Sequence, residues 1–233
     1  MTALDPLGRL HAEKLAVFES GRSRLVVPGF DPAPALAAIA ARSASAPGVP
    51  VELACEEDFA VLDGETGTLP WLCVSVPSHW APEEKLGLDF ATLHGPVADN
   101  AVLLAASRQL VALATGGDCW ERFVWTISSS GHYDQHPGRH PRSPWPATSD
   151  AEEFARGCWL RAERQVFFPV GQGTRQAVFA IRVMLQPLVE FVAGPAQAQR
   201  MHDSLATMSD AVLTYKSLVA AREPLLRWLK ART

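Results

Sequence analysis

The sequence predicts an α+β fold, in which one antiparallel sheet of about five strands carries helices over one face. A chain of 233 residues is long enough for one domain with a buried core. Segments rich in valine and aromatic residues are separated by short turns, and helical segments lie before, between and after them. We expect residues 1–50 to form a helical lead-in with an Ala/Pro-rich linker, and residues 51–233 to form the domain.

The first part of the chain contains one helical segment and a predicted hairpin. A helix is expected around His11–Ser20, and the stretch DPAPALAAIAARSASAPGVP ends in Pro47 and Pro50. Two strands follow, FAVLD at 59–63 and LPWLCVSVP at 69–77, with GETG as the turn between them.

The middle of the chain alternates between helical and extended patterns. Residues 79–94 have turn-like and short helical character. Asn100 is placed to cap a helix that Gly116 and Gly117 end. ERFVWTISSS then alternates as a strand.

The last hundred residues begin with a long loop at 131–150, in which proline and glycine are frequent. Ser149 and Glu152 form a capping-box pattern for a short helix. CWLRAERQVFFPV, the turn GQGT and RQAVFAIRVMLQPL predict a long hairpin. Helices near Pro195–Leu213 and Pro224–Ala231 complete the chain.

Composition argues against several classes of partner. The net charge is -4, with no basic patch for nucleic acid or anionic membranes. No window reaches the roughly 18 apolar residues of a membrane span, and the N-terminus lacks a signal-peptide pattern. We therefore expect a cytoplasmic protein. Cys55, Cys73, Cys119 and Cys158 are widely spaced, which predicts reduced core residues.

Arg164 stands out in the predicted strand Leu160–Phe168, because it shares an otherwise apolar face. A guanidinium there needs an anionic or strongly accepting partner. One alternative is a local carboxylate such as Glu163 or Glu153, or an exposed guanidinium at a strand edge that needs no such partner. The other is the carboxylate of a ligand that lies on the sheet. Arg122 and Arg161 would add to such an anion site, or be solvated.

Histidines are the other candidate functional groups. His132, His136 and His140 recur every four residues, but prolines and a glycine exclude a helix there, so they belong either to a polar surface loop or to a lid over a pocket. His79 follows a predicted strand and is typical of a surface or supporting group. His94 precedes a Gly-Pro turn, where it is either a hydrogen-bonded core residue or a metal ligand. Common nucleotide-binding and hydrolase motifs are absent from the sequence.

Several stretches together resemble one family. They are PSHWAPEEKLGLDFATLHGPV, ERFVW, LRAERQVFF, VFAIRVMLQPL and TYKSL, which occur in the order of the corresponding family motifs and extend over about residues 51–231. The family is that of the haem-dependent oxidative N-demethylase alpha-subunit-like proteins. The loop at 131–150 and the Val183-Met184 pair depart from the family pattern.

This resemblance implies a PAS-like domain that binds haem b. His94 would be the iron ligand, with His79 as the weaker candidate. Arg164, with Arg122 and Arg161, would face the haem propionates, and Trp125 would line the apolar wall of the pocket.

The resemblance implies an oxidoreductase that oxidises an amine or another small nitrogen-containing metabolite with dioxygen or peroxide. His132 or His136 would relay protons, and a separate flavin and iron–sulfur reductase would supply electrons. The alternatives are a non-enzymatic haem-PAS sensor or haem-binding protein, and a ligand-binding module without haem.

Overall fold

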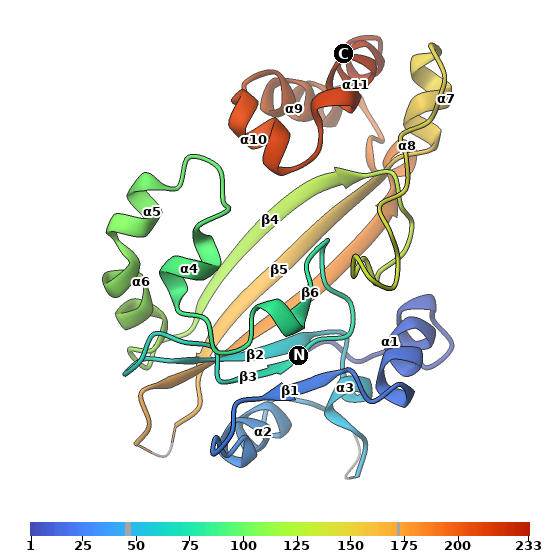
Figure 1. Ribbon diagram of the computed structural model, residues 1–233. Helices are drawn as coiled ribbons and strands as arrows, with labels where there is room; N and C mark the ends of the chain where they lie inside the picture. The colour runs from blue at the N-terminus through green and yellow to red at the C-terminus, as the bar shows by residue number, and fades with distance from the viewer. Residues whose placement is uncertain (45–47, 172) are drawn as a thin grey trace.

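The computed structural model describes residues 1–44, 48–171 and 173–233. Within these residues, six strands form one antiparallel sheet in the order β1-β3-β2-β6-β5-β4 (Figure 1). The strands are β1 (Arg24–Val26), β2 (Asp58–Asp63), β3 (Trp71–Cys73), β4 (Trp120–Ser128), β5 (Trp159–Pro169) and β6 (Gln176–Pro187).

The prediction of an α+β fold with one antiparallel sheet is confirmed, whereas the strand count of five is wrong. The sixth strand is β1, which pairs with β3. Three residues are too few for an alternating pattern to stand out in a sequence. The PAS-like arrangement stays a prediction. The predicted linker end at Pro47 and the turn residue Gln172 lie outside the described residues.

Helices lie before, between and after the strands. They are α1 (Arg9–Glu19), α2 (Ala33–Ala40), α3 (Val51–Ala54), the 3-10 helix η1 (Pro82–Glu84), α4 (Phe90–His94), α5 (Ala101–Ala105), α6 (Ser107–Ala114), α7 (Ala151–Arg156), α8 (Leu188–Phe191), α9 (Pro195–Ala206), α10 (Asp210–Tyr215) and α11 (Val219–Lys230). In Figure 1, α4–α6 form a group beside the long strands, and α9–α11 lie beyond the far end of those strands. No helix within the described residues is long and apolar enough to cross a membrane.

The side-chain hydrogen bonds at the starts of two helices differ from the expected ones. Asp150, rather than a Ser149–Glu152 box, caps α7, since its carboxylate accepts the backbone N–H groups of Glu152 and Glu153. Asn100 precedes α5, but its amide donates to carbonyls near the end of α4 instead of capping α5.

The long strands have two different faces, defined by the alternation of side chains in β5. The Glu163 face carries the odd-numbered side chains Trp159, Arg161, Glu163, Gln165 and Phe167, and the Arg164 face carries the even-numbered ones from Leu160 to Phe168. Clusters of buried apolar side chains join the Arg164 face to α2 near one end and to the C-terminal helices near the other. The Glu163 face is the more polar of the two.

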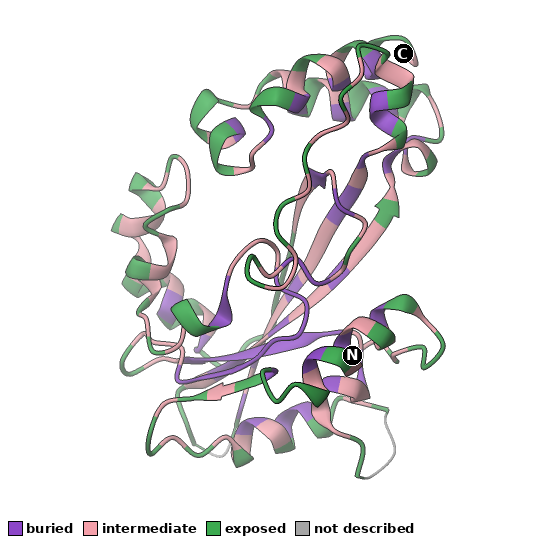
Figure 2. Cartoon of the chain, turned by 45° about the vertical axis from the view of Figure 1, so that its right-hand side comes forward, coloured by how far each residue is buried: buried purple, intermediate pink, exposed green. Residues whose placement is uncertain are grey.

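Residues before position 50 join the same sheet and core. α2 contributes Ala35 and Ile39 to the cluster that contains Phe59 and Trp71. Figure 2 shows the buried strands β2 and β3 crossing the lower part of the molecule beside these N-terminal elements. The domain boundary at residue 50 stays a prediction.

Three of the four cysteines, Cys55, Cys73 and Cys158, are buried and free, as expected. Cys119 is free but exposed, so the expectation that it belongs to the core is wrong. It precedes β4, whose first residues are exposed.

A buried ion pair fastens α1 to the sheet. Lys14 is inaccessible to solvent, and its Nζ lies 3.0 Å from Asp58 Oδ1. The ammonium also donates to the carbonyls of Cys55, Glu56 and Glu57. Asp58 Oδ2 accepts two backbone N–H groups just after β3. Both charges are therefore compensated inside the protein.

We expect Lys14→Met to lower the free energy of unfolding by ~3–5 kcal/mol, because it leaves the Asp58 charge buried without its partner. Urea denaturation measures the change. Lys230→Met at an exposed site is the control, with an expected change within ~0.5 kcal/mol. Equal effects of the two substitutions would contradict the role of the buried pair.

Candidate functional site

His94 is the last residue of α4, a helix of five residues that local hydrogen bonds hold in place. The carboxylate of Asp89 caps the helix by accepting the backbone N–H and the hydroxyl of Thr92, each at 2.9 Å. At the other end, the side-chain amide of Asn100 donates to the carbonyls of His94 and Gly95. The backbone on both sides of His94 is therefore fixed.

The His94 imidazole is held in one tautomer. Its Nδ1 lies 2.8 Å from the carbonyl oxygen of Phe90, and the two rings stack with centroids 4.1 Å apart. A carbonyl only accepts, so Nδ1 carries the proton and Nε2 keeps its lone pair. Burial lowers the pKa of His94, the Phe90 carbonyl opposes this, and the positive charge of Arg122 lowers it further. These influences favour the neutral imidazole, and no hydrogen bond to its Nε2 occurs among the described residues.

A chain of polar side chains crosses the Glu163 face. Arg122 Nε donates to Gln165 Oε1 at 2.7 Å, and Gln165 Nε2 donates to Glu163 Oε2 at 2.7 Å. Ser78 donates its hydroxyl to the other oxygen of Glu163 and accepts from Arg161 Nε at 2.7 Å. Both oxygens of the Glu163 carboxylate are therefore held, between guanidinium groups at the two ends of the chain.

Arg161 is the buried end of this chain, at 1% exposure. Besides Ser78, its guanidinium donates to the carbonyls of Val76, His132 and Tyr133. Burial lowers the pKa of Arg161 to about 10, and nearby carboxylates oppose the shift, Glu163 foremost. The group stays a cation at neutral pH, satisfied by acceptors from the segment after β3 and the loop after β4.

The C-terminal helices reach the same site. Lys216 Nζ donates to the carbonyl of Trp125 on β4 at 2.7 Å. Burial raises the pKa of Tyr215, and the negative charge of Glu163 raises it further. Burial lowers the pKa of Lys216, which Glu163 opposes. Tyr215 and Lys216 therefore lie within electrostatic reach of the Glu163 carboxylate.

Two of the predicted cofactor-binding residues belong to the other face of the sheet. Arg164 forms an ion pair with Glu121 of β4. Trp125 is partly buried against the apolar cluster of the C-terminal helices. The alternation of β4 and β5 puts both side chains on the Arg164 face, away from Arg122 and Glu163. Their roles in cofactor binding stay predictions, whereas Arg122 and Arg161 share the Glu163 face.

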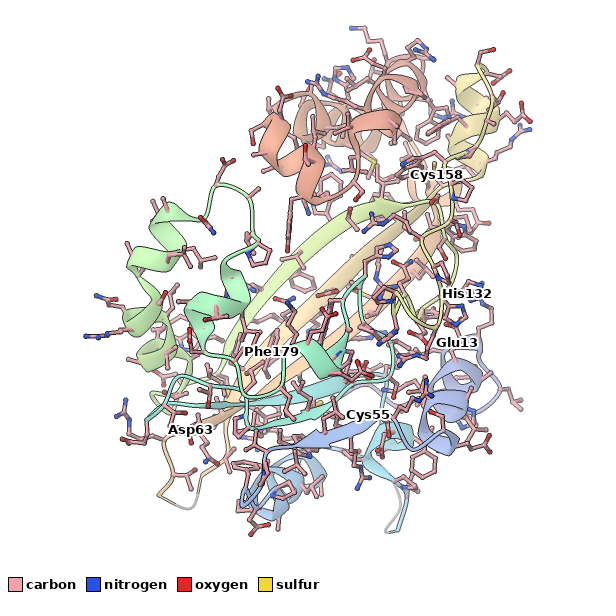
Figure 3. The ribbon with its side chains drawn as sticks, viewed as in Figure 1. Glu13, Cys55, Asp63, His132, Cys158 and Phe179 are labelled. Carbon is pink, nitrogen blue, oxygen red and sulfur yellow. The ribbon has the colours of Figure 1, made fainter. Side chains whose placement is uncertain are left out.

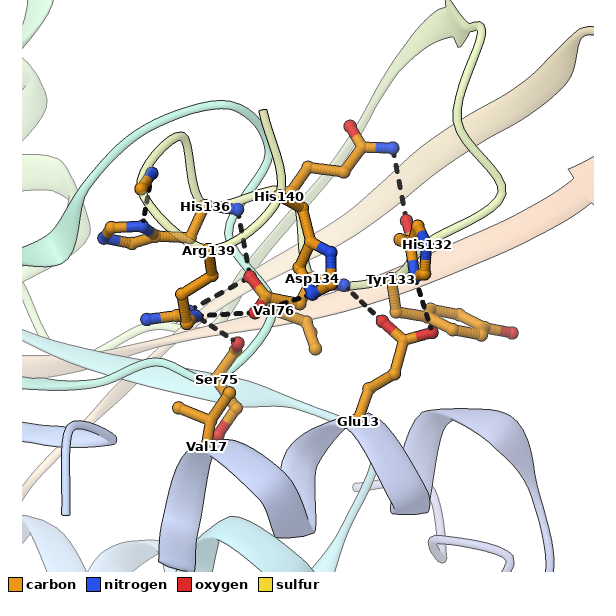
Figure 4. A network of polar contacts seen from close by, with 12 residues as sticks. Glu13, Val17, Ser75, Val76, His132, Tyr133, Asp134, His136, Arg139 and His140 are labelled. Atoms are coloured by element: carbon orange, nitrogen blue, oxygen red, sulfur yellow. Dashed lines mark hydrogen bonds and ion pairs between the residues drawn. The ribbon is translucent and has the colours of Figure 1, made fainter. Parts of the chain in front are cut away.

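The predicted catalytic histidines lie in a loop that α1 and η1 hold. His132 is 55% exposed in its side chain, stacks on His140 with centroids 4.4 Å apart, and has Nδ1 3.9 Å from Glu13 of α1. His136 Nε2 lies 3.0 Å from Glu83 of η1. Figure 4 shows the contact of His132 with Glu13. Neither imidazole has a contact with His94 among the described residues, and the catalytic roles stay predictions.

His79 has a left-handed backbone with φ of 60°, which is costly for a residue with a side chain. It directly follows Ser78. Burial lowers the pKa of His79 to about 4, and the positive charges of Arg142 and Arg161 contribute. The imidazole is therefore neutral at physiological pH and stands beside the buried end of the polar chain.

Sequence reasoning assigned no role to Ser78, Gln165, Tyr215 or Lys216, and it named Glu163 only as a partner of Arg164. The available signal was the run Arg161, Glu163 and Gln165, three polar side chains on one face of a strand. Attention to the apolar face of the same strand selected Arg164 instead. The contribution of Ser78 depends on the contact of the segment after β3 with β5, which is distant in the chain, and no local sequence pattern shows such a contact.

Metal coordination by several protein side chains is not seen in the described part of the chain, where no three His, Cys, Asp or Glu residues gather as a metal site. A haem iron needs only one such ligand, since the porphyrin supplies four nitrogens. Comparison with protein-family models matches residues 46–226 to the family "Haem-dependent oxidative N-demethylase, alpha subunit-like".

We expect the low pKa of His79 to make the fold sensitive to acid. An unfolded histidine takes up its proton near its ordinary pKa of 6.5, whereas folded His79 does so only near 4. Stability is therefore lost as the pH falls from about 6.5 to about 4. His79→Asn keeps a residue that tolerates the left-handed backbone but does not titrate, so the free energy of unfolding should fall less steeply with acid. His202→Asn on α9 is the control, and an unchanged slope in His79→Asn would refute the assignment.

Proposed function

Because the chain belongs to the haem-dependent oxidative N-demethylase alpha-subunit-like family, we propose that it is a haem-dependent oxidoreductase whose iron is ligated by His94. The substrate would be an amine or another small nitrogen-containing metabolite, oxidised with dioxygen or peroxide. The observation that carries the proposal is the His94 imidazole, which donates from Nδ1 to the Phe90 carbonyl and whose Nε2 has no hydrogen bond within the described part of the chain.

Such an arrangement fits a haem ligand well. Histidines that bind metals typically donate the second ring N–H to a carbonyl or carboxylate, which fixes the ring and increases its basicity. Burial and the charge of Arg122 both favour the neutral form of His94, and only the neutral form has a lone pair for iron. The residues present therefore fit the group that the family name implies.

Arg122 supplies a partner for a haem propionate. Its Nε is bound to Gln165, but its two terminal nitrogens have no hydrogen bond or ion pair within residues 1–44, 48–171 and 173–233. Burial lowers the pKa of Arg122, with Glu163 opposing the shift. Arg122 is exposed, and a guanidinium with free donors is suited to a carboxylate, which it can bind through two hydrogen bonds. We assign that contact to Arg122 rather than to Arg164, which already has Glu121.

Haem b would supply the iron chemistry that activates dioxygen or peroxide. The protein contributes charge and orientation. Glu163, whose two oxygens are held by Ser78 and Gln165, would bind the ammonium group of a protonated amine or accept its proton. Tyr215 and Lys216 would close the site from the C-terminal side.

Electron supply belongs to the proposal as well. Monooxygenation with dioxygen consumes two electrons from a reductant, and we assign their supply to a separate flavin and iron–sulfur reductase in the cytoplasm. Peroxide would remove that requirement, because it already carries the two electrons.

The absorption spectrum of the protein produced with added haem precursor tests the ligand. We expect a Soret band in the wild type that shifts or disappears in His94→Ala but persists in the control His202→Ala. A colourless wild type would overturn the haem proposal. A spectrum unchanged in His94→Ala would overturn the ligand assignment. A haem protein that oxidises no amine with a surrogate reductant or with peroxide would contradict the enzymatic part.

We also expect Arg122→Gln to weaken haem binding by ~10-fold or more, because a charge-assisted hydrogen bond contributes ~1.5–3 kcal/mol. Arg164→Gln on the opposite face is the matched control and should leave the affinity within about twofold. Titration of the haem-free variants with haem measures both values. A larger loss of haem affinity in Arg164→Gln than in Arg122→Gln would assign the propionate contact to Arg164.

A further inference from the structure

The buried guanidinium of Arg161 depends on the loop after β4. We call residues 131–142 the histidine loop. Two of the four acceptors of Arg161 are carbonyls of this loop, at 3.3 Å for His132 and 2.9 Å for Tyr133. At 1% exposure, the guanidinium cannot replace a lost acceptor with water at no cost. The position of the loop therefore determines the position of Arg161.

Helix α1 in turn holds the histidine loop. Glu13 Oε2 accepts the backbone N–H of Asp134 at 2.7 Å. One turn earlier, Arg9 donates to the carbonyl of Gly131 and lies over the ring of Tyr133 at 5.8 Å. Figure 3 shows Glu13 on α1 close to His132 of the loop. α1 lies outside the residues that match the family model, which begin at 46.

Hydrogen bonds within the histidine loop, and from it to the segment after β3, make the loop move as one unit. The Asp134 carboxylate, 3% exposed, binds Arg139 through both oxygens, at 2.6 and 3.0 Å. Arg139 also donates to the carbonyl of Ser75, and the backbone N–H of Gln135 donates to the carbonyl of Pro77. A displacement at Asp134 is thus carried both to the carbonyls that hold Arg161 and to the segment that bears Ser78.

We propose that Glu13 is a positioning residue for the Glu163 carboxylate, acting through the histidine loop, Arg161 and Ser78. The consequence for catalysis rests on the proposed function, but the chain of contacts does not. Glu13→Ala leaves the Asp134 N–H without its acceptor and releases the loop carbonyls from Arg161. Ser78 then loses its donor, and Glu163 loses the hydroxyl that fixes one of its oxygens.

Solvent exchange of the Arg161 Nε–H proton, followed by nitrogen-15 NMR of the full chain, reads the middle of this pathway. The resonance is assigned by its loss in Arg161→Lys. We expect Glu13→Ala to increase the exchange rate by ~10-fold or more, because a hydrogen-bonded donor becomes accessible. Glu13→Gln keeps a carbonyl oxygen for the Asp134 N–H and should restore the rate to within about twofold of the wild type. Glu19→Ala, at the exposed end of α1, is the control.

Arg9→Leu gives a second variant should Glu13→Ala not fold, and it should also accelerate exchange, since it removes the contact with Gly131. Unchanged exchange in the Glu13 or Arg9 variants would overturn the proposal.

A double-mutant cycle tests the last step, to Glu163. Glu13 and Glu163 make no direct contact among the described residues, so independent effects on the unfolding equilibrium constant would multiply. For the double variant Glu13→Ala, Glu163→Gln, we expect the change in the unfolding equilibrium constant to differ by ~5-fold or more from the product of the two single-variant changes. Agreement between the double-variant change and that product to within about twofold would show that Glu13 only stabilises α1, and would overturn the positioning role. Neither measurement uses haem or turnover, so failure here and failure of the proposed function are distinguishable.

Discussion

A guanidinium almost without access to solvent organises this protein. Arg161 cannot be neutralised at physiological pH, and its hydrogen bonds must therefore be satisfied by the fold. Among the described residues, two segments converge on Arg161 of β5 to do so: the segment after β3, with Val76 and Ser78, and the loop after β4, with His132 and Tyr133. The charge is balanced through Ser78 by Glu163. Stability and the orientation of a site carboxylate thus depend on the same group.

The two faces of β5 have different roles, one in packing and one at the candidate site. The face that carries Arg164 is packed against helices at both ends, where two separate apolar clusters form. The opposite face carries Glu163 between two cations, and charges on this face influence His94 of α4 and Tyr215 of α10. Since a shift of one residue exchanges these faces, the register of β4, β5 and β6 fixes both the core and the site.

Local patterns predicted the antiparallel hairpins well, because turn residues and valine-rich segments are contiguous in sequence. They failed for β1, a strand of three residues, and for the break at Ala106 between α5 and α6. At the site, the motif around His94 directed attention to that residue, whose role stays a prediction, and Arg164 was preferred to Glu163 because the partner of Arg164 was unknown. Glu121 is 43 residues away in the chain, so its ion pair with Arg164 follows from strand pairing rather than from spacing.

The position of the haem on the sheet tests the central claim most directly. A crystal structure of the haem-loaded protein would show which face of β5 the porphyrin contacts and which nitrogen binds the iron. We expect iron bound to His94 Nε2, with Arg122 at a propionate and Glu163 facing the same space. A porphyrin on the face of Arg164, or iron bound by His79 or a loop histidine, would contradict the assignment of the site.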